Sequence, residues 1–169
     1  KNVLRAVGAD AELVSRVKNI ISERKFLPGG RYLYATGRPY HQVNNCFLFR
    51  ADDSREGWGN LMEKATLSLM SGGGIGTVYS DLRPKGSIVR KTGGFSTGPC
   101  ALMQMQNEAG RFVMQGGSRR CAIWAGLHWS HQDVMEFAEL KNWSPEVRAL
   151  KAKDYNFPAP MDMTNISVI

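Results

Sequence analysis

The sequence predicts an α/β fold, in which helices and strands alternate along the chain and neighbouring parallel strands are joined by helical crossovers. Three observations predict it. Apolar residues recur at helical spacing in several segments, apolar runs of strand length lie between these segments, and glycine-rich loops separate them. With 43% hydrophobic and 22% charged residues, the 169-residue chain is typical of a globular protein and unlike a disordered or fibrous one.

The first half of the chain is predicted to contain two helices with a strand between them. The first helix has one apolar face and is followed by a turn-rich stretch as far as Gln42. Residues 46–49 are a short apolar run that predicts a buried strand. Asp53 or Ser54 is predicted to cap the second helix, with Glu56 completing a capping box. The two apolar helix faces consist of Leu13, Val14, Val17, Ile20 and Ile21, and of Trp58, Leu61, Met62, Ala65 and Leu69.

The second half of the chain repeats the pattern of strand and helix. Strands are predicted at residues 75–79, 121–127 and 164–169, because each is an apolar run next to turn residues. A further helix, running to Leu140, is predicted to be capped by Ser130 and Asp133. The helix that begins at Pro99 is predicted to bury Leu102, Met105, Ala109, Phe112 and Val113.

Positive charge is concentrated in two loops rather than along a helix. The net charge is +7, from 22 Lys and Arg against 15 Asp and Glu. Glycine lets backbone N–H groups approach a phosphate, and arginine supplies a planar fork for its oxygens. The pattern favours a nucleotide or another phosphorylated small molecule over a duplex, with solvated surface loops as the alternative. The loop cations are Arg83, Lys85, Arg90 and Lys91 in one loop, and Arg119 and Arg120 in the other.

Common nucleotide, metal and disulfide motifs do not fit this sequence. Thr77 occupies the third glycine position of a G-x-G-x-x-G pattern, and no G-x-x-x-x-G-K-[ST] motif occurs. His128 and His131 have no nearby cysteine or acidic cluster, so a structural role is favoured and no metal site is predicted. The few, widely spaced cysteines favour a reducing, cytoplasmic setting and, on the residues alone, inert buried thiols. They are Cys46, Cys100 and Cys121.

A set of motifs in a fixed order carries a specific resemblance. The motifs are Asn44-Asn45-Cys46 through Asp53, the glycine run at 71–76, Arg83 with 86–88, and the segments 97–98, 115–120, 131–137, 140–142 and 165–168. With these motifs the chain resembles the catalytic subunit of ribonucleotide reductase, most closely the adenosylcobalamin-dependent class II type. Class I large subunits share the same framework. The resemblance implies the N-terminal portion of a ten-stranded α/β barrel preceded by a short helical segment. Residues 1–42 would end a helical region and linker, and residues 43–169 would be the first part of a truncated barrel.

The resemblance also implies roles for individual residues. Cys46 matches one of the two cysteines whose dithiol reduces the substrate, and it is expected to lie buried beside the ribose. Asp53 and Arg83 match the site of an allosteric effector deoxynucleotide. Substrate contacts are implied for Asn45, Gly73 and Gly74. The loop that relays effector identity to the substrate matches Gln115, Gly116, Gly117, Ser118 and Arg119.

The activity that the resemblance implies is reduction of ribonucleotides to 2′-deoxyribonucleotides by thiyl-radical chemistry. It implies adenosylcobalamin in the complete enzyme, a dNTP or ATP effector, a thioredoxin- or glutaredoxin-type reductant and a homodimer, with no nucleic acid or membrane partner. The family's radical cysteine lies in an Asn-x-Cys-x-Glu context that does not occur here, and neither Cys100 nor Cys121 matches the second redox cysteine. The chain alone is therefore expected to be inactive. The alternatives are a class I large subunit and a basic nucleic-acid-binding module without catalysis, whose binding would depend steeply on salt.

Overall fold

The structure, a computed structural model, describes residue 4 and residues 8–35, 38–39, 42–91, 93–113 and 121–169. The chain divides into two compact units, residues 1–45 and residues 46–169. The first unit contains helix α2 (Ala11–Ser22), which is capped at its N-terminus by Asp10. The Asp10 carboxylate accepts a hydrogen bond from the N–H of Leu13 at 2.7 Å. The first unit also contains helix α3 (Gly30–Ala35), which lies within the stretch predicted to be rich in turns and was not itself predicted.

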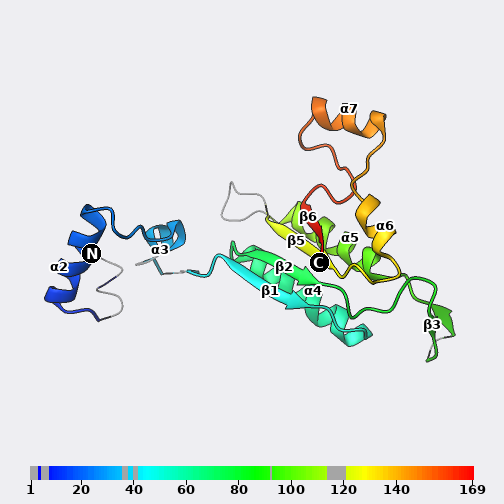
Figure 1. Cartoon of the computed structure of the whole chain (residues 1–169), viewed down its shortest axis with the longest axis horizontal. Coiled ribbons are helices and arrows are strands. Elements are labelled where there is room, and N and C mark those ends of the chain that lie inside the picture. Colours follow the sequence, from blue (N-terminus) through cyan, green and yellow to red (C-terminus); the bar gives the residue numbers. More distant parts are fainter. Residues whose placement is uncertain (1–3, 5–7, 36–37, 40–41, 92, 114–120) are drawn as a thin grey trace. The chain divides into compact units, whose positions relative to one another are not determined.

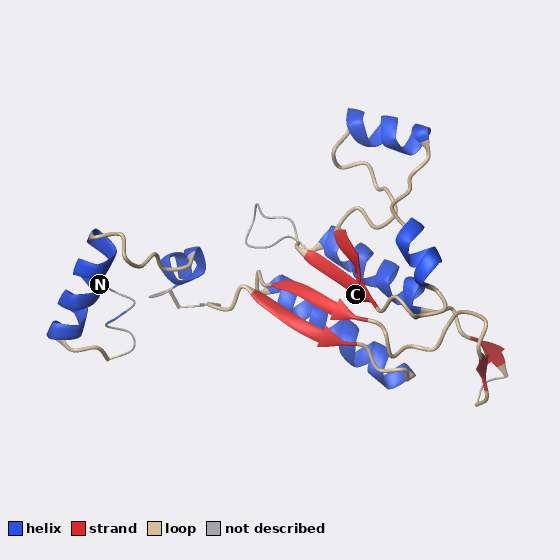
Figure 2. Cartoon of the chain, in the orientation of Figure 1, coloured by secondary structure: helices blue, strands red, loops and turns tan. Residues whose placement is uncertain are grey.

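The second unit is built on a parallel sheet. Among the described residues, four strands lie in the order β1 (Cys46–Arg50), β2 (Gly74–Val78), β5 (Ile123–Leu127) and β6 (Thr164–Val168), and each neighbouring pair is parallel. Helices α4 (Arg55–Met70) and α5 (Pro99–Phe112) lie together along one side of this sheet (Figures 1 and 2). The predicted α/β fold with a parallel sheet is confirmed.

Shorter elements complete the second unit. An antiparallel hairpin of β3 (Ile88–Val89) and β4 (Gly94–Phe95) forms within and just after the predicted basic loop. Helix α6 (Val134–Glu139) follows β5, and helix α7 (Pro145–Lys153) precedes β6. The sequence did not predict α7, which has no buried residue and begins where Ser144 accepts a hydrogen bond from the N–H of Val147 at 3.4 Å. None of the helices in the described ranges is both long and apolar enough to cross a bilayer.

The core lies between the sheet and the helices on its covered side. Alternate residues of β2 and β5 point to this side, as the period of a strand requires. Removing such side chains from water stabilises the fold by roughly 1.5–3 kcal/mol for each large aliphatic or aromatic residue. The main cluster includes Leu61, Tyr79, Leu82, Leu102, Met103, Ala125, Leu127, Phe137 and Met161, and a second one includes Ala65, Leu69, Ile75 and Ile123.

The buried face of α5 differs from the predicted one. Leu102 is buried and Ala109 and Val113 are partly buried, but Met105 is 50% exposed and Phe112 is 80% exposed. The buried face instead carries Gln106 and Asn107, because each satisfies buried polar groups of the sheet. Gln106 Oε1 accepts hydrogen bonds from the Thr77 hydroxyl at 3.2 Å and from the Tyr79 hydroxyl. Asn107 Oδ1 accepts from the N–H of Met163 and the hydroxyl of Thr164, both at 3.0 Å.

Strand β1 forms, but the prediction that it is buried is wrong. It lies at the edge of the described sheet, and its residues alternate between exposed and half-buried. Phe47 and Phe49 face the helices, whereas Leu48 is 74% exposed on the opposite side. On that opposite side Trp124 lies over Gly76 and Gly126, and its indole N–H donates to the Ser167 hydroxyl at 2.9 Å. A side chain at either glycine would displace the indole.

Candidate functional site

The loops that follow β1, β2 and β5 meet at one edge of the sheet. The three strands are parallel, so their carboxyl ends lie at the same edge, which is where ligands bind in α/β sheets. The loop after β1 contains Asp53, and the longer segment after β2 contains Arg83. The structure brings these two side chains together although they are 30 positions apart in the sequence.

Asp53 and Arg83 form an ion pair in which one N–H of the guanidinium group is shared by both carboxylate oxygens. The Nε of Arg83 donates to the two carboxylate oxygens of Asp53 at 2.8 and 3.0 Å, and each side chain is about one-third exposed. Asp53 is free for this contact because Ser54, rather than Asp53, caps helix α4, accepting a hydrogen bond from the N–H of Gly57 at 2.9 Å. The predicted capping box of Asp53 and Glu56 is therefore wrong; Glu56 pairs with Arg55 at 3.5 Å.

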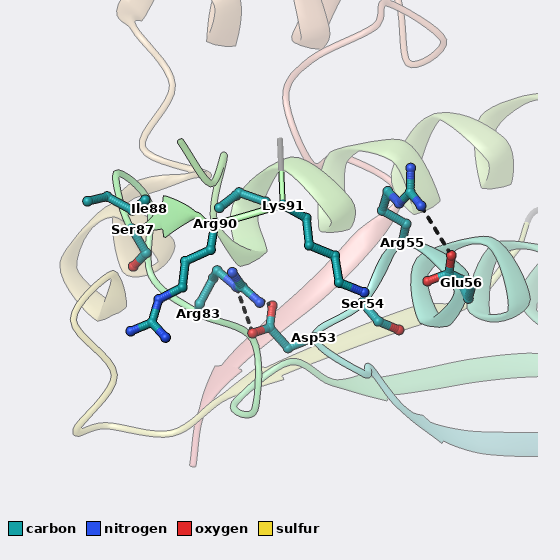
Figure 3. Close-up of a pocket in the computed structure, with 10 residues that line it drawn as sticks. Asp53, Ser54, Arg55, Glu56, Arg83, Ser87, Ile88, Arg90 and Lys91 are labelled. Atoms are coloured by element: carbon teal, nitrogen blue, oxygen red, sulfur yellow. Dashed lines mark hydrogen bonds and ion pairs between the residues drawn. The ribbon is translucent and has the colours of Figure 1, made fainter. Parts of the chain in front are cut away.

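A cavity of about 600 Å³ surrounds this ion pair (Figure 3). In the view of Figure 3, Arg90 and Lys91 extend from the segment after β3 on either side of the Asp53–Arg83 pair. Four cationic side chains and two acidic ones line the cavity together with two hydroxyl groups, so it combines positive charge with hydrogen-bond donors. Its lining consists of Asp53, Ser54, Arg55, Glu56, Arg83, Ser87, Ile88, Val89, Arg90 and Lys91.

A second cavity, of about 360 Å³, shares Asp53 and Arg83 with the first. Two aromatic side chains line it, Trp58 from α4 and Phe95 from β4, and Phe95 is 72% exposed. Thr97 adds a hydroxyl group. The two cavities together offer cations for phosphate oxygens next to aromatic surface for a base, the two kinds of contact that a nucleotide needs.

Cys46 and Gly74 are direct partners across β1 and β2. A Cβ atom at Gly74 would lie 3.5 Å from the Cys46 Sγ and 3.4 Å from Ala122, so glycine leaves the thiol open on the uncovered side of the sheet. A Cβ atom at Gly73 would meet the ring of Phe47. The predicted burial of Cys46 is wrong, because the edge position of β1 exposes the thiol.

The other two thiols are buried and poorly suited to redox chemistry. Burial raises the pKa of Cys100 to about 12, with Glu136 and Asp133 contributing in the same direction. Burial also raises the pKa of Cys121, whose thiol lies 3.1 Å from the carbonyl oxygen of Val113. At neutral pH almost none of either thiol would be thiolate, the reactive form.

Asn45, which was predicted to contact the substrate, lines neither of the two cavities. Asn45 is exposed at the end of the first unit. The predicted specificity-loop residues 115–119 lie outside the described residues. Among the residues that are described, no group of three or more His, Cys, Asp and Glu side chains could hold a metal ion.

The sequence indicated some cavity residues and not others. Arg90 and Lys91 are among the clustered loop cations that predicted a phosphate-bearing ligand, and both line the first cavity, although the family resemblance carried no role for either one. Trp58 was predicted to point into the core, and it does pack there partly while also lining the second cavity. Phe95 gave no signal, because nothing in the sequence indicates the short hairpin that carries it.

Residues 44–157 match the family described as the ribonucleotide reductase barrel domain. The sequence is also similar to curated proteins of that kind. It is 34% identical over 124 residues to the vitamin B12-dependent ribonucleoside-diphosphate reductase of Thermoplasma acidophilum, covering 73% of this chain and 16% of that protein. It is 34% identical over 136 residues to the ribonucleoside-diphosphate reductase large chain of Schizosaccharomyces pombe, covering 79% and 17%.

A viral relative shows the same degree of similarity. The chain is 33% identical over 134 residues to the ribonucleoside-diphosphate reductase large subunit of monkeypox virus, covering 78% of this chain and 17% of the relative. The chain thus spans about a sixth of the length of the curated relatives it matches.

Proposed function

The chain belongs to the ribonucleotide reductase barrel-domain family, and we propose that it supplies two working parts of such an enzyme. The first is an effector site for a deoxynucleoside triphosphate or ATP at the two cavities around Asp53 and Arg83. The second is Cys46 as one thiol of the dithiol that reduces a ribonucleotide substrate. The observation that carries the proposal is the ion pair of Asp53 and Arg83 inside a cation-lined cavity of about 600 Å³.

The chemistry of the first cavity suits the phosphates of a nucleotide. Arg83, Arg90 and Lys91 provide donors in several directions, and the planar guanidinium of arginine binds two phosphate oxygens at once. Asp53 holds Arg83 in place and can also accept a hydrogen bond from a sugar hydroxyl. Trp58 and Phe95 offer aromatic surface to the base in the second cavity.

Cys46 would serve as one half of a two-electron reductant. As the 2′-hydroxyl of the ribose leaves as water, two thiols give up two electrons and two protons and become a disulfide. An external dithiol of the thioredoxin or glutaredoxin type would restore the two thiols. The exposed position of Cys46 beside Gly74 leaves room for a sugar and for the second thiol. No residue of this chain is assigned to the radical step.

We propose adenosylcobalamin as the cofactor of the complete reductase, because the Thermoplasma acidophilum relative is named as vitamin B12-dependent. The two described cavities, of about 600 and 360 Å³, suit a nucleotide and are too small for a corrin ring with its attached groups. No residue described here is therefore assigned to that cofactor. In the full-length protein, turnover that requires added adenosylcobalamin is the expected result. Turnover that instead requires a separate metal-bearing subunit would contradict it and indicate a class I enzyme.

Replacing Arg83 by Gln tests the proposed effector site. In the full-length protein, Arg83→Gln is expected to weaken binding of dATP or dTTP by between about 10- and 150-fold, because a charge-assisted hydrogen bond to phosphate contributes roughly 1.5–3 kcal/mol. Titration calorimetry at fixed salt measures the change. Arg148→Gln is the matched control, since Arg148 is exposed on α7 and lines neither described cavity.

The same titrations separate the effector site from general binding of nucleic acid. A basic nucleic-acid-binding module would lose affinity for DNA or RNA steeply with salt and would respond equally to both arginine substitutions. A nucleic-acid-binding module is not favoured, because Asp53 and Glu56 lie among the cations of the cavity and would repel a continuous phosphate backbone. Equal effects of Arg83→Gln and Arg148→Gln on dATP binding would contradict the proposed site.

A further inference from the structure

The loop after β5 is joined to the loop that carries Arg83. The N–H of His128 donates to the Ser80 hydroxyl at 3.0 Å, close to the end of β2. Further along, His131 and Asp133 contact backbone groups of the segment 82–85, which includes Arg83. Neither His131 nor Asp133 lines a described cavity, so each of them is connected to the site through the segment that carries Arg83.

His131 is fixed through both ring nitrogens. Its Nδ1 accepts a hydrogen bond from the N–H of Asp133 at 3.1 Å, which leaves the proton on Nε2. The Nε2–H donates to the carbonyl oxygen of Leu82 at 2.8 Å, one residue before Arg83. The side chain is only 6% exposed, so water competes little for these bonds.

Asp133 contacts the backbone two residues after Arg83, at Lys85. Its Oδ2 accepts a hydrogen bond from the N–H of Lys85 at 2.9 Å, and its side chain is 12% exposed. The sequence predicted Asp133 as a helix-capping partner, but it makes no side-chain cap to α6 and uses its carboxylate for this loop contact instead. The side chain of Lys85 also pairs with Glu136 on α6, at 3.1 Å.

Gly98 brings a third segment to the same junction. It has a φ of +75°, and a Cβ atom there would lie 2.8 Å from Asp133 Oδ2 and 2.9 Å from the Lys85 Cβ. Only glycine allows this approach. The residues just before it, Ser96 and Thr97, line the second cavity. Asp133 thus contacts the loop that contains Arg83 and lies close to the segment that lines the second cavity.

We infer that His131 and Asp133 are positioning residues that fix Arg83 for binding a phosphate-bearing ligand. This inference rests on the proposed effector site. The backbone is held at Leu82 and at Lys85, and Pro84 between them restricts the remaining rotation. A guanidinium binds phosphate through directional bonds, so a small displacement of Arg83 lowers affinity even though every cavity side chain is still present.

The test is a double-mutant cycle in the full-length protein, read as dissociation constants for dATP and dTTP. Asp133→Ala and His131→Ala are each expected to weaken binding about tenfold. Asp133→Asn retains an oxygen that accepts from the Lys85 N–H and is expected to bind within about twofold of the wild type. With Arg83→Gln already present, Asp133→Ala is expected to add no further loss.

A matched control excludes a general effect of removing a loop carboxylate. Asp154 also accepts a hydrogen bond from a backbone N–H, that of Asn156 two positions further along the chain, at 2.8 Å, but it lines neither described cavity. Asp154→Ala should leave nucleotide binding unchanged. If Asp133→Ala fails to fold, His131→Ala decides the question from the other side of Arg83.

Two results would overturn the inference while leaving the proposed function intact. One is unchanged binding in both alanine variants when Arg83→Gln weakens it. The other is an equal loss from Asp133→Ala with and without Arg83→Gln, which would show that Asp133 acts independently of Arg83. If Arg83→Gln itself has no effect, the proposed effector site is wrong and the inference fails with it.

Discussion

Replacing Cys46 by Ser in the full-length protein is expected to lower kcat for ribonucleotide reduction by more than about a thousandfold. A hydroxyl group cannot be oxidised to a disulfide, so the second thiol would have no partner and the two electrons would not be delivered. Turnover with a dithiol reductant measures the loss. Effector binding should be unchanged, because Cys46 lines neither cavity at Asp53 and Arg83.

Cys121→Ser is the matched control for this substitution. The Cys121 thiol lies 3.1 Å from the Val113 carbonyl oxygen, and a serine hydroxyl can donate to the same acceptor. Activity is therefore expected to stay within about twofold of the wild type. Turnover that survives Cys46→Ser, or that is lost equally in Cys121→Ser, would contradict the redox role of Cys46.

Asp162→Ala is expected to destabilise the fold by about 3–5 kcal/mol, the usual cost of removing one member of a buried ion pair. The Asp162 side chain is 2% exposed and accepts hydrogen bonds from Arg111 at 2.7 and 3.0 Å and from Lys151 at 2.6 Å. It thereby ties α5 to α7. The variant would leave two largely buried cations without this carboxylate. Urea unfolding at pH 7 measures the free energy.

An exposed ion pair provides the control for Asp162. Asp81 pairs with Arg50, but the two side chains are 44% and 71% exposed, so Asp81→Ala is expected to cost about 1 kcal/mol or less. Equal losses in the two variants would contradict the account of a buried ionic connection between α5 and α7.

Lowering the pH should remove the contribution of Asp162 to the free energy of unfolding of the wild type. Burial acts to raise the pKa of Asp162, but hydrogen bonds from Arg111 and Lys151 outweigh it and hold the pKa below the ordinary 3.8. Because the folded-state pKa is the lower one, the stabilisation is complete above about pH 5 and is lost as the pH falls through the folded-state value. Unfolding free energies of Asp162→Ala should show less of this acid dependence than those of the wild type.

The sequence predicted the main helices and strands of the second unit because their patterns are local. Helix α4 buries Leu61, Ala65 and Leu69 as expected from their spacing. The inward face of α5 could not be predicted from hydropathy, since Gln106 and Asn107 are buried to satisfy polar groups on other elements. The exposure of β1 depends on strand order, which no local pattern reveals.

The candidate site was predictable in part. Clustered loop cations indicated a phosphate ligand, and the resemblance to the reductase family selected Asp53 and Arg83, which the structure brings into contact. The contributions of Phe95 and of the His131 and Asp133 contacts were not predictable, because each depends on a long-range approach of loops. A capping motif and a loop-fixing carboxylate look alike in sequence, as Asp133 shows.

The most direct test of the nucleotide site is an experimental structure of the full-length protein with a bound deoxynucleoside triphosphate. Phosphate oxygens are expected within about 3 Å of Arg83 and of Arg90 or Lys91, with the base against Trp58 or Phe95. A nucleotide bound elsewhere, with the cavity at Asp53 and Arg83 holding no phosphate, would contradict the proposed effector site.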